Sequence, residues 1–433
     1  MRKLCSAALA LVLGVLSATI STSPPRTASA ATPVVGFSPT SGVLFNNPDG
    51  TLAEQMVLLD QLGRSIDAAP PGSVIRMATY SLSYQPTADQ LLAAFARGVQ
   101  IRLIIDSHAE TDQIAQLRKK LGTSSSRTSY LRTCRYGCMS AKPSFLHTKL
   151  YMFSTSGKAK KVTMISSANP AGGGGTEAWN NTYTVVGDLA IYNANLSNFN
   201  DMLKDTTNPN YYRTASSGPY KVYFFPRGGV DRKSDTYNNI LNEVRCTGVA
   251  PGYGENGRTV IKIAMYRWTS LRKNLAQRLW QLQDQGCNVQ IIYSADTVEQ
   301  PVVAELLRPG GRNGRIGVSN GRLDRNGDGV LDLYIHSKYV LINGVYGTRN
   351  NVKAVYTGSP NFTSNSLRES NETALRIGND QVYDQFFANF RFIRANYTLP
   401  VTKVPSPAVA QRQQGVYDAE GERTDDYWVS PDE

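Results

Sequence analysis

The chain contains two copies of one pattern, and this internal repeat constrains the fold more than any other feature of the sequence. The segment "FLHTKLYMF" at 145–153 recurs as "YIHSKYVLI" at 334–342, and "VTMISSANP" at 162–170 recurs as "AVYTGSPNF" at 354–362. Other segments recur in the same order, at separations of 186 to 192 residues. Self-similarity at a nearly constant separation is the signature of a duplicated structural unit. The sequence therefore predicts two homologous halves.

Each half alternates strand-like with helix-like segments. "IRMATYSL" at 75–82 is followed by a helical pattern and a second apolar strand, and "IKIAMYRW" at 261–268 begins the same succession. Alternating strands and helices predict an α/β unit in which helices cover a central sheet. We therefore expect two α/β/α sandwich halves, 31–215 and 216–400, that are related by pseudo-two-fold symmetry and share one active site.

The two ends of the chain differ in composition from the repeated region. Residues 1–30 begin with Arg2 and Lys3, continue with an apolar run and end with Ala-Ser-Ala, which is typical of a secretory signal peptide. Residues 401–433 are rich in proline, glutamine and acidic side chains. Such a composition predicts an extended or disordered tail.

Four cysteines follow the predicted signal peptide. An even number of cysteines in an exported chain favours disulfides. Four cysteines allow three connectivities, and proximity along the chain favours the pairs Cys134–Cys138 and Cys246–Cys287. We therefore expect a secreted, extracellular protein that has no free thiol and no transmembrane segment.

Two of the three histidines occupy matching positions in the repeats. His147 and His336 each precede a lysine by two residues, so that in a strand the two side chains project from the same face. A serine and an asparagine follow in each half. The candidate catalytic residues are therefore His147, Lys149, Ser167, Asn169, His336, Lys338, Ser359 and Asn361.

These side chains suit chemistry on a phosphodiester. Two imidazoles supply a nucleophile and a general acid that are effective near neutral pH. The lysines supply fixed positive charge, and the asparagines and serines supply hydrogen-bond donors, which together suit a transition state with charge on several oxygens. No cluster of carboxylates or histidines at metal-ligand spacing accompanies these motifs. We therefore expect a reaction that requires no metal and no other cofactor.

At these motifs the sequence resembles the phospholipase D superfamily, whose mark is H-x-K-x4-D followed by G-S-x-N, normally twice per chain. The resemblance covers about residues 35–400 and implies two α/β/α halves with one shared site and a displacement through a phosphohistidine. The motif aspartate is replaced by Ser154 in the first half and by Asn343 in the second, and Ser166 stands where glycine is usual. Tyrosyl-DNA phosphodiesterases, another branch of the family, also lack this aspartate.

Family members often carry an acidic residue just past the second part of the motif, and Glu372 fits that place. Its predicted counterpart in the first half is Asn181. A carboxylate bonded to an imidazole raises the pKa of the ring, so we expect His336 to hold a proton as general acid while His147 attacks phosphorus. In related phospholipases the first-motif histidine is also usually the nucleophile. Which ring Glu372 contacts stays open at the level of sequence.

A candidate calcium loop lies just before the second motif. Asp324, Asn326, Asp328 and Asp332 occupy loop positions 1, 3, 5 and 9 of "DRNGDGVLD", with glycine at position 6. Position 12 is Ile335 rather than glutamate, and the same composition also forms turns. The two interpretations are a structural calcium ion outside the chemistry and a plain turn.

Net charge and motifs together indicate the class of substrate. The charge of +12 falls by three, to +9, when residues 1–30 are removed, and it suits an anionic partner. The first candidate function is a monomeric, secreted hydrolase of the phospholipase D type that contacts membrane surfaces transiently. The alternatives are a secreted, metal-independent nuclease of the same superfamily and a non-catalytic binder of anionic surfaces. Retention of both histidines, both lysines and both asparagines argues against the binder.

Overall fold

The computed structural model describes residues 36–140, 142, 144–294, 297–321, 323 and 332–404. The predicted signal peptide, nearly all of the predicted tail and three of the four candidate calcium ligands, Asp324, Asn326 and Asp328, lie outside these residues. All described residues lie within one compact unit.

The first half is built around a seven-stranded sheet with the strand order β1-β8-β6-β5-β2-β3-β4. β2, β3 and β4 are parallel neighbours, and the other pairs are antiparallel. The strands are β1 (Gly42–Phe45), β2 (Val74–Thr79), β3 (Gln100–Asp106), β4 (Tyr130–Cys134), β5 (Leu150–Ser156), β6 (Ala159–Ser166) and β8 (Asn181–Val186). The helices are α1 (Leu52–Asp67), α2 (Gln85–Ala96), α3 (Asp112–Leu121), α4 (Gly173–Thr176) and α5 (Leu189–Met202).

The second half contains a ten-stranded sheet with the order β19-β14-β13-β12-β16-β17-β18-β10-β9, and β11 pairs with β16 beside this path. The strands are β9 (Arg213–Ser217), β10 (Tyr220–Phe224), β11 (Val244–Arg245), β12 (Val260–Met265), β13 (Asn288–Tyr293), β14 (Gly317–Asn320), β16 (Lys338–Tyr346), β17 (Arg349–Gly358), β18 (Thr373–Ile377) and β19 (Leu399–Pro400). The α-helices are α6 (Thr236–Asn242), α7 (Lys273–Asp284), α8 (Gln300–Leu306), α9 (Ser364–Arg368) and α10 (Asp380–Asn396). Two 3-10 turns cover Arg232–Ser234 and Ser270–Arg272.

The two halves repeat one another element by element. The order β10-β18-β17-β16-β12-β13-β14 reproduces β1-β8-β6-β5-β2-β3-β4, and α6 to α10 follow the same strands as α1 to α5. The predicted duplicated α/β/α architecture is therefore confirmed. The residues at which the two halves divide remain a prediction.

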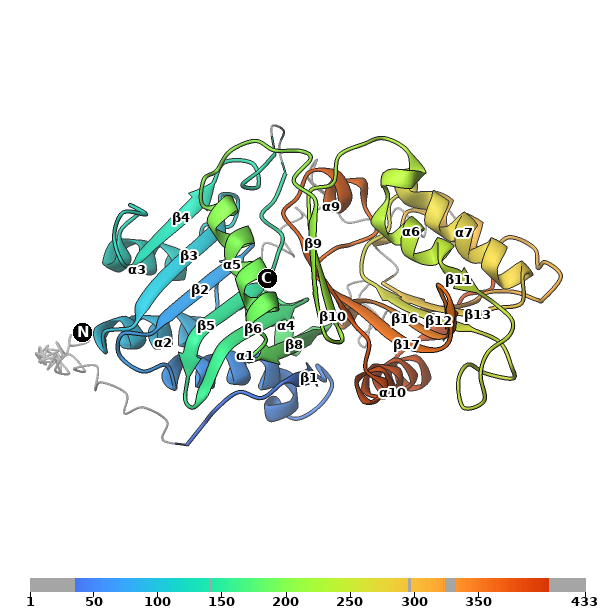
Figure 1. The fold of residues 1–433 in the computed structure, drawn as a ribbon, viewed down its shortest axis with the longest axis horizontal. Helices are drawn as coiled ribbons and strands as arrows, with labels where there is room; N and C mark the ends of the chain where they lie inside the picture. Colours follow the sequence, from blue (N-terminus) through green and yellow to red (C-terminus); the bar gives the residue numbers. More distant parts are fainter. Residues whose placement is uncertain are drawn as a thin grey trace, which may run out of the picture. The chain divides into compact units, whose positions relative to one another are not determined.

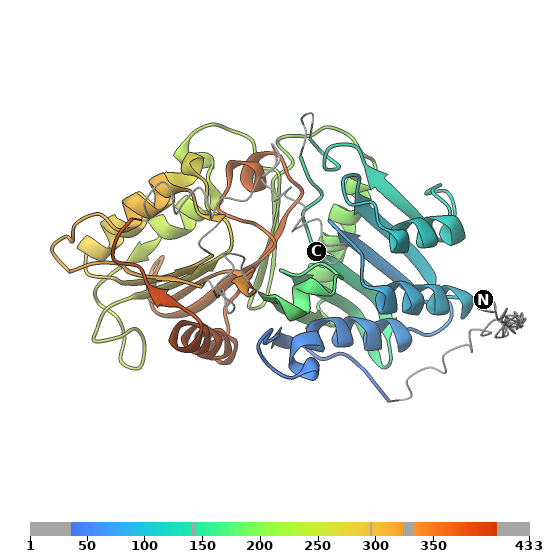
Figure 2. The same cartoon turned by 180° about the vertical axis from the view of Figure 1, so that it is seen from behind.

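Apolar side chains hold the layers together. One core lies between the first sheet and α1, α2 and α3, and another lies between the second sheet and α6, α7 and α8. A third core joins the two halves, because side chains of α5 and α10 pack there with residues of both sheets. Figure 1 shows α5 across one face of the first sheet, and Figure 2 shows α1 and α2 on its other face. Full burial of a large apolar side chain contributes about 1.5–3 kcal/mol, so this shared core binds the halves firmly.

Helix α1 illustrates how the sequence forms these layers. Thr51 caps its N-terminus in a capping box with Glu54, which satisfies backbone N–H groups that the first turn leaves unpaired. Leu59, Leu62 and Ile66 then recur at helical spacing and are buried, and Leu62 and Ile66 belong to the core against the sheet. This long helix covers the outer face of the first sheet.

Two short parallel pairings connect the halves near the motifs. β7 (Ala178–Trp179) pairs with β15 (Tyr334–Ile335), and Leu146 forms an isolated bridge with Asn371. Each pairing lies directly before a motif histidine, so both histidines are placed at the junction of the halves.

The cysteines pair as predicted, Cys134 with Cys138 and Cys246 with Cys287. The second disulfide joins the segment after β11 to the segment before β13. Within the part of the chain that the structure describes, no helix is both long and apolar enough to span a membrane.

Candidate active site

The motif histidines of both halves line one small pocket. Its accessible volume is about 30 Å³, and its walls are Tyr80, His147, Ala168, Asn169, Ala171, Gly174, Tyr334 and His336. His147 lies three residues before β5 begins and His336 two residues before β16 begins, rather than inside the predicted strands. The pocket therefore combines the first-half motif with the second-half histidine.

His147 is held by a carboxylate from the other half. Its Nδ1 donates to Oε1 of Glu372 over 2.9 Å, and the side chain of Glu372 is fully buried. The backbone helps to position the ring, since the N–H of His147 donates to the carbonyl of Asn371. This places Glu372 on His147 and not on His336.

His336 is held in the same way by an amide from the first half. Its Nδ1 donates to Oδ1 of Asn180 over 2.9 Å. Ser167 also donates to that oxygen, and the amide nitrogen of Asn180 donates to the carbonyl of Gly174, so the orientation of the amide is fixed. Each histidine is thus braced by a side chain from the opposite half.

The counterpart of Glu372 is Asn180 and not the predicted Asn181. Backbone N–H groups of Ser167 and Ser359 donate to the carbonyls of Asn181 and Thr373, which fixes the register between the repeats. Asn181 instead donates from its amide to Thr357. The predicted alignment was one residue out of register here, and sequence reasoning therefore missed Asn180. The separation of 192 residues between Asn169 and Asn361 would have found it if it had been continued to residue 372.

The two braces have different electrostatic consequences. Burial, together with the positive charges of Lys338 and Lys149 and the proximity of the second imidazole, that of His147, holds the pKa of His336 well below its ordinary value of 6.5. The expectation that a carboxylate would raise the pKa of His336 was therefore wrong. The ring retains some contact with solvent at the pocket.

Glu372 is ionised despite its burial. Burial alone would raise its pKa, but His147, the charge of Lys149 and a hydrogen bond from Ser359 outweigh burial and lower the pKa below its ordinary value of 4.5. Glu372 therefore presents a negative charge directly to the ring of His147.

Both motif lysines are almost fully buried, each at 1% exposure. The ammonium group of Lys149 donates to the carbonyl of His147 over 2.7 Å and lies 5.9 Å from the ring centre of Tyr80. The ammonium group of Lys338 lies 5.0 Å from the ring centre of Tyr266, which occupies the matching position of the repeat. Burial strengthens the electric field of these charges at the pocket, because little water screens them.

The motif asparagines are held by equivalent contacts. Oδ1 of Asn169 accepts from the hydroxyl of Thr79 over 3.1 Å, and Oδ1 of Asn361 accepts from the backbone N–H of Arg267 over 3.3 Å. Since the oxygen of each amide is engaged, the NH₂ group is the one available to bind an anion. A buried ion pair supports the second asparagine, because Arg272 bonds to Asp235 and donates to the carbonyl of Asn361.

The motif serines contact the residues that hold the histidines, or their direct neighbours. Ser167 donates to Asn180 over 2.7 Å and accepts from the backbone of Asn181, and both motif serines are fully buried. Ser359 accepts from the backbone N–H of Thr373, the residue directly after Glu372. Both serines therefore position the residues that hold the histidines.

A family model described as "Cardiolipin synthase, PLD-like domain" matches residues 63–202 and again residues 255–393. The chain belongs to the phospholipase D superfamily. Members of this superfamily are enzymes that act on phosphodiesters. No curated protein matches the chain.

Two solved structures show the same fold at low identity. A phosphatidylserine synthase from Haemophilus influenzae Rd KW20 has a TM-score of 0.54 at 12% identity, over 83% of this chain and 90% of that one. A polyphosphate kinase from Porphyromonas gingivalis has a TM-score of 0.52 at 13% identity, over 82% of this chain and 50% of that one. The chain thus spans about half the length of the kinase, and at these identities the likeness shows the fold alone.

The two positions at which the superfamily usually has an aspartate lie away from the pocket. Ser154 and Asn343 each follow a motif lysine by five residues, which is about 17 Å along a strand. Ser154 accepts from the backbone of Val74, and Asn343 accepts from the backbone of Gly254. Their replacement therefore changes contacts between neighbouring segments and removes no group that lines the pocket.

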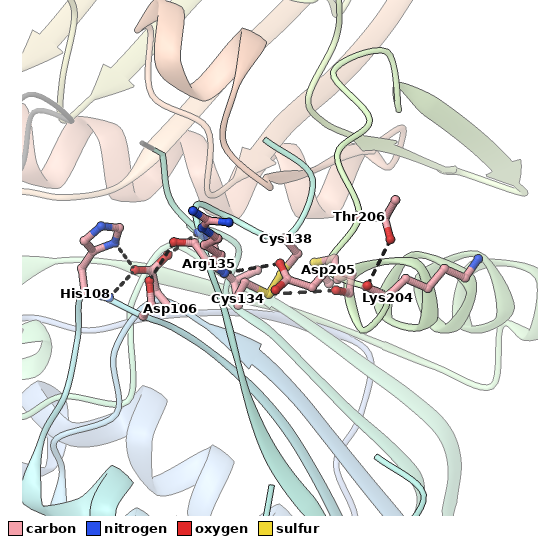
Figure 3. The surroundings of a disulfide bond; sticks show 11 residues. Asp106, His108, Cys134, Arg135, Cys138, Lys204, Asp205 and Thr206 are labelled. Carbon is pink, nitrogen blue, oxygen red and sulfur yellow. Dashed lines mark hydrogen bonds and ion pairs between the residues drawn. A yellow bond between two sulfur atoms is a disulfide. The ribbon is translucent and has the colours of Figure 1, made fainter. Parts of the chain in front are cut away.

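A buried aspartate anchors the segment that carries the first motif. Oδ2 of Asp106 accepts from the backbone of Leu146 over 2.5 Å, and Oδ1 accepts from both the backbone and the ring of His108. Figure 3 shows Asp106 and His108 beside the Cys134–Cys138 loop. The side chain of His108, the third histidine, is 39% exposed, and through Asp106 it helps to hold the segment that carries the first motif.

The calcium prediction stays untested. Asp332 is the one candidate ligand among the described residues, and its backbone N–H donates to Leu323. Across the described ranges, no group of three His, Cys, Asp or Glu side chains is placed to hold a metal ion.

Proposed function

We propose that the protein is a secreted phosphodiesterase that hydrolyses phospholipid headgroups through a phosphohistidine. The observation that carries this proposal is the reciprocal bracing of two histidines at one pocket, His147 by Glu372 and His336 by Asn180. Because Nδ1 makes each bracing contact, Nε2 is the nitrogen through which each ring reacts.

In the first step, Nε2 of His147 attacks phosphorus and forms a P–N bond. The bond between phosphorus and the leaving oxygen breaks, and that oxygen takes the proton from Nε2 of His336. Glu372 stabilises the positive charge that develops on His147, since its carboxylate is ionised and in contact with the ring. The lysines and the amide groups of the asparagines hold the remaining phosphate oxygens, so the required charge comes from side chains and not from a metal.

His336 takes its proton from solvent when the anionic substrate binds and raises the pKa of the ring. Lys338 and Lys149 contribute to the low pKa of His336, and a bound phosphodiester offsets their charge. In the second step, neutral His336 removes a proton from water, the water oxygen attacks phosphorus, and the P–N bond breaks. The products are a phosphate monoester and restored His147. The low resting pKa thus suits the role of base in this step.

Exposed apolar side chains near the site support a lipid substrate. Val230 and Leu271 are 103% and 80% exposed, and both line one groove of about 530 Å³. Leu271 follows Tyr266 by five residues, and the ring of Tyr266 contacts that of His336 at 4.6 Å. Arg232 and Lys273 line the same groove. Apolar tips beside cationic side chains are suited to contact with a phospholipid surface.

A secreted nuclease is the second candidate. The net charge of +9 that remains without residues 1–30 supports it, because a basic protein attracts the phosphates of nucleic acid. The two disulfides are compatible with secretion under either proposal.

Parallel assays on phosphatidylcholine vesicles and on DNA, both with EDTA, separate these candidates. We expect headgroup release from vesicles and no cleavage of DNA; the reverse result would make the protein a nuclease. The double variant Val230→Ser/Leu271→Ser should lose most activity on vesicles and keep its activity on a soluble diester such as bis(p-nitrophenyl) phosphate. Leu52→Ser, which changes an exposed side chain on α1, is the matched control and should leave both activities intact.

A further inference from the structure

The second half contains a larger hollow on the outer face of its sheet. The hollow has an accessible volume of about 490 Å³ and none of its walls belongs to the motifs. Its lining includes Lys221, Tyr223, Arg227, Glu243, Arg349 and Arg376. It reaches the end of β16 at Tyr346, whereas Lys338 marks the other end of that strand, about 26 Å away.

A difference between the repeats creates this hollow. Helix α6 has 7 residues, whereas its counterpart α1 has 16. In the first half, α1 covers the outer face of the sheet with apolar side chains such as Leu62 and Ile66. The shorter α6 leaves part of the equivalent face over β10, β17 and β18 uncovered. Tyrosines and basic side chains line that space in place of an apolar core.

Two positive charges stand directly opposite one another on this face. Lys221 of β10 pairs with Arg376 of β18, and Arg376 pairs in turn with Tyr356 of β17. Residues directly opposite on antiparallel strands project to the same side, and like charges placed there repel. Such a pair opposes folding unless an anion neutralises it.

The described residues supply little compensation. Glu243 is the one acid among the lining residues, and it is exposed, whereas Arg227 and Arg349 add two more cations. The Nε of Arg376 is buried and has no hydrogen-bond partner among the described residues. The ring of Tyr223 lies 5.2 Å from Lys221, and this contact places the cation without neutralising it.

We propose that this hollow binds a phosphate monoester dianion, separately from the active site. A doubly charged group between Lys221 and Arg376 would neutralise both cations. The volume exceeds that of a phosphate alone and lies in the range of pockets for organic ligands. The tyrosine-lined remainder would hold the organic part of the ester, which is either a soluble molecule or a lipid.

Calorimetric titration of the full-length protein with glycerol 3-phosphate tests the site. The wild type should show a binding event that Lys221→Gln/Arg376→Gln weakens at least about tenfold. Lys119→Gln/Lys120→Gln removes two exposed charges from α3 and should bind as the wild type does. Thermal melting checks the fold: relief of the repulsion should leave the Tm of the Lys221/Arg376 variant equal to or above that of the wild type.

Coincident isotherms for the wild type and the Lys221/Arg376 variant would overturn the proposal, as would a large drop in Tm, which would make the pair a structural element. Vesicles of phosphatidylcholine with and without phosphatidate identify the source of the ester. Loss of phosphatidate-dependent binding in this variant alone assigns the site to a lipid. Unchanged vesicle binding with loss of glycerol 3-phosphate binding assigns it to a soluble ester.

Discussion

Replacing Glu372 with glutamine should slow phosphorylation of the protein without weakening substrate binding. Glutamine has nearly the same shape and can still accept the hydrogen bond from Nδ1 of His147. It removes the negative charge, which is present at any pH of practical interest because the pKa of Glu372 lies below 4.5. Glu372 does not line the pocket, so the effect should fall on kcat and not on KM.

The expected size of the effect follows from the contact. The hydrogen bond spans 2.9 Å, and the carboxylate is fully buried, so solvent screens it little. A hydrogen bond to a charged group contributes about 1.5–3 kcal/mol and a neutral one about 0.5–1.5 kcal/mol, so replacing the carboxylate by an amide costs about 1–1.5 kcal/mol. Since about 1.4 kcal/mol corresponds to a tenfold change in rate, Glu372→Gln should lower the rate of P–N bond formation about 5- to 12-fold.

Rapid-quench measurement of the phosphoenzyme with bis(p-nitrophenyl) phosphate gives this rate directly. Glu369→Gln is the control, because Glu369 also lies at the junction of the halves, where it accepts from Ser140 and touches neither histidine. It should change the rate less than about twofold. A rate in Glu372→Gln within twofold of the wild type would refute the role given to this carboxylate.

Three further predictions concern stability and covalent state. Below pH 6.5 the unfolded chain protonates the imidazole of residue 336 while the folded protein keeps it neutral, so the free energy of unfolding should fall as the pH drops; denaturant titrations should show a weaker pH dependence in His336→Asn. Thiol titration of the denatured, unreduced mature protein should detect about zero thiols; two would contradict one disulfide, and four would contradict both. If the 324–332 loop binds calcium, millimolar calcium should raise the Tm and Asp328→Ala should abolish the rise, whereas an unchanged Tm in the wild type would favour a turn.

The duplicated fold was predictable because the sequence itself is repeated. Strand and helix patterns recur with their motifs at a nearly constant separation, and the two sheets accordingly share one strand order. The disulfide pairs followed from short separations along the chain. Apolar residues recur every 2 residues in a half-buried strand and every 3.6 residues in a helix, and these local periods can be read from a single sequence.

The braces of the histidines were not predictable in the same way. Glu372 lies 225 residues from His147, and Asn180 lies 156 residues from His336, so no local pattern connects them. The sequence instead favoured a contact within one half, between Glu372 and His336. The actual arrangement depends on how the halves meet, through the pairing of β7 with β15 and the bridge at Leu146. The low pKa of His336 likewise depends on how the halves pack, because burial at their junction and the charge of Lys149 from the other half contribute to it.

The covalent intermediate tests the central claim most directly. Protein quenched during turnover of bis(p-nitrophenyl) phosphate should be digested and its phosphopeptides mapped by mass spectrometry under alkaline conditions that preserve phosphohistidine. The account predicts one adduct, on His147, that forms more slowly in Glu372→Gln and is absent in His147→Asn. An adduct on His336 would reverse the roles of the two rings, and turnover without any histidine adduct would contradict the two-step mechanism.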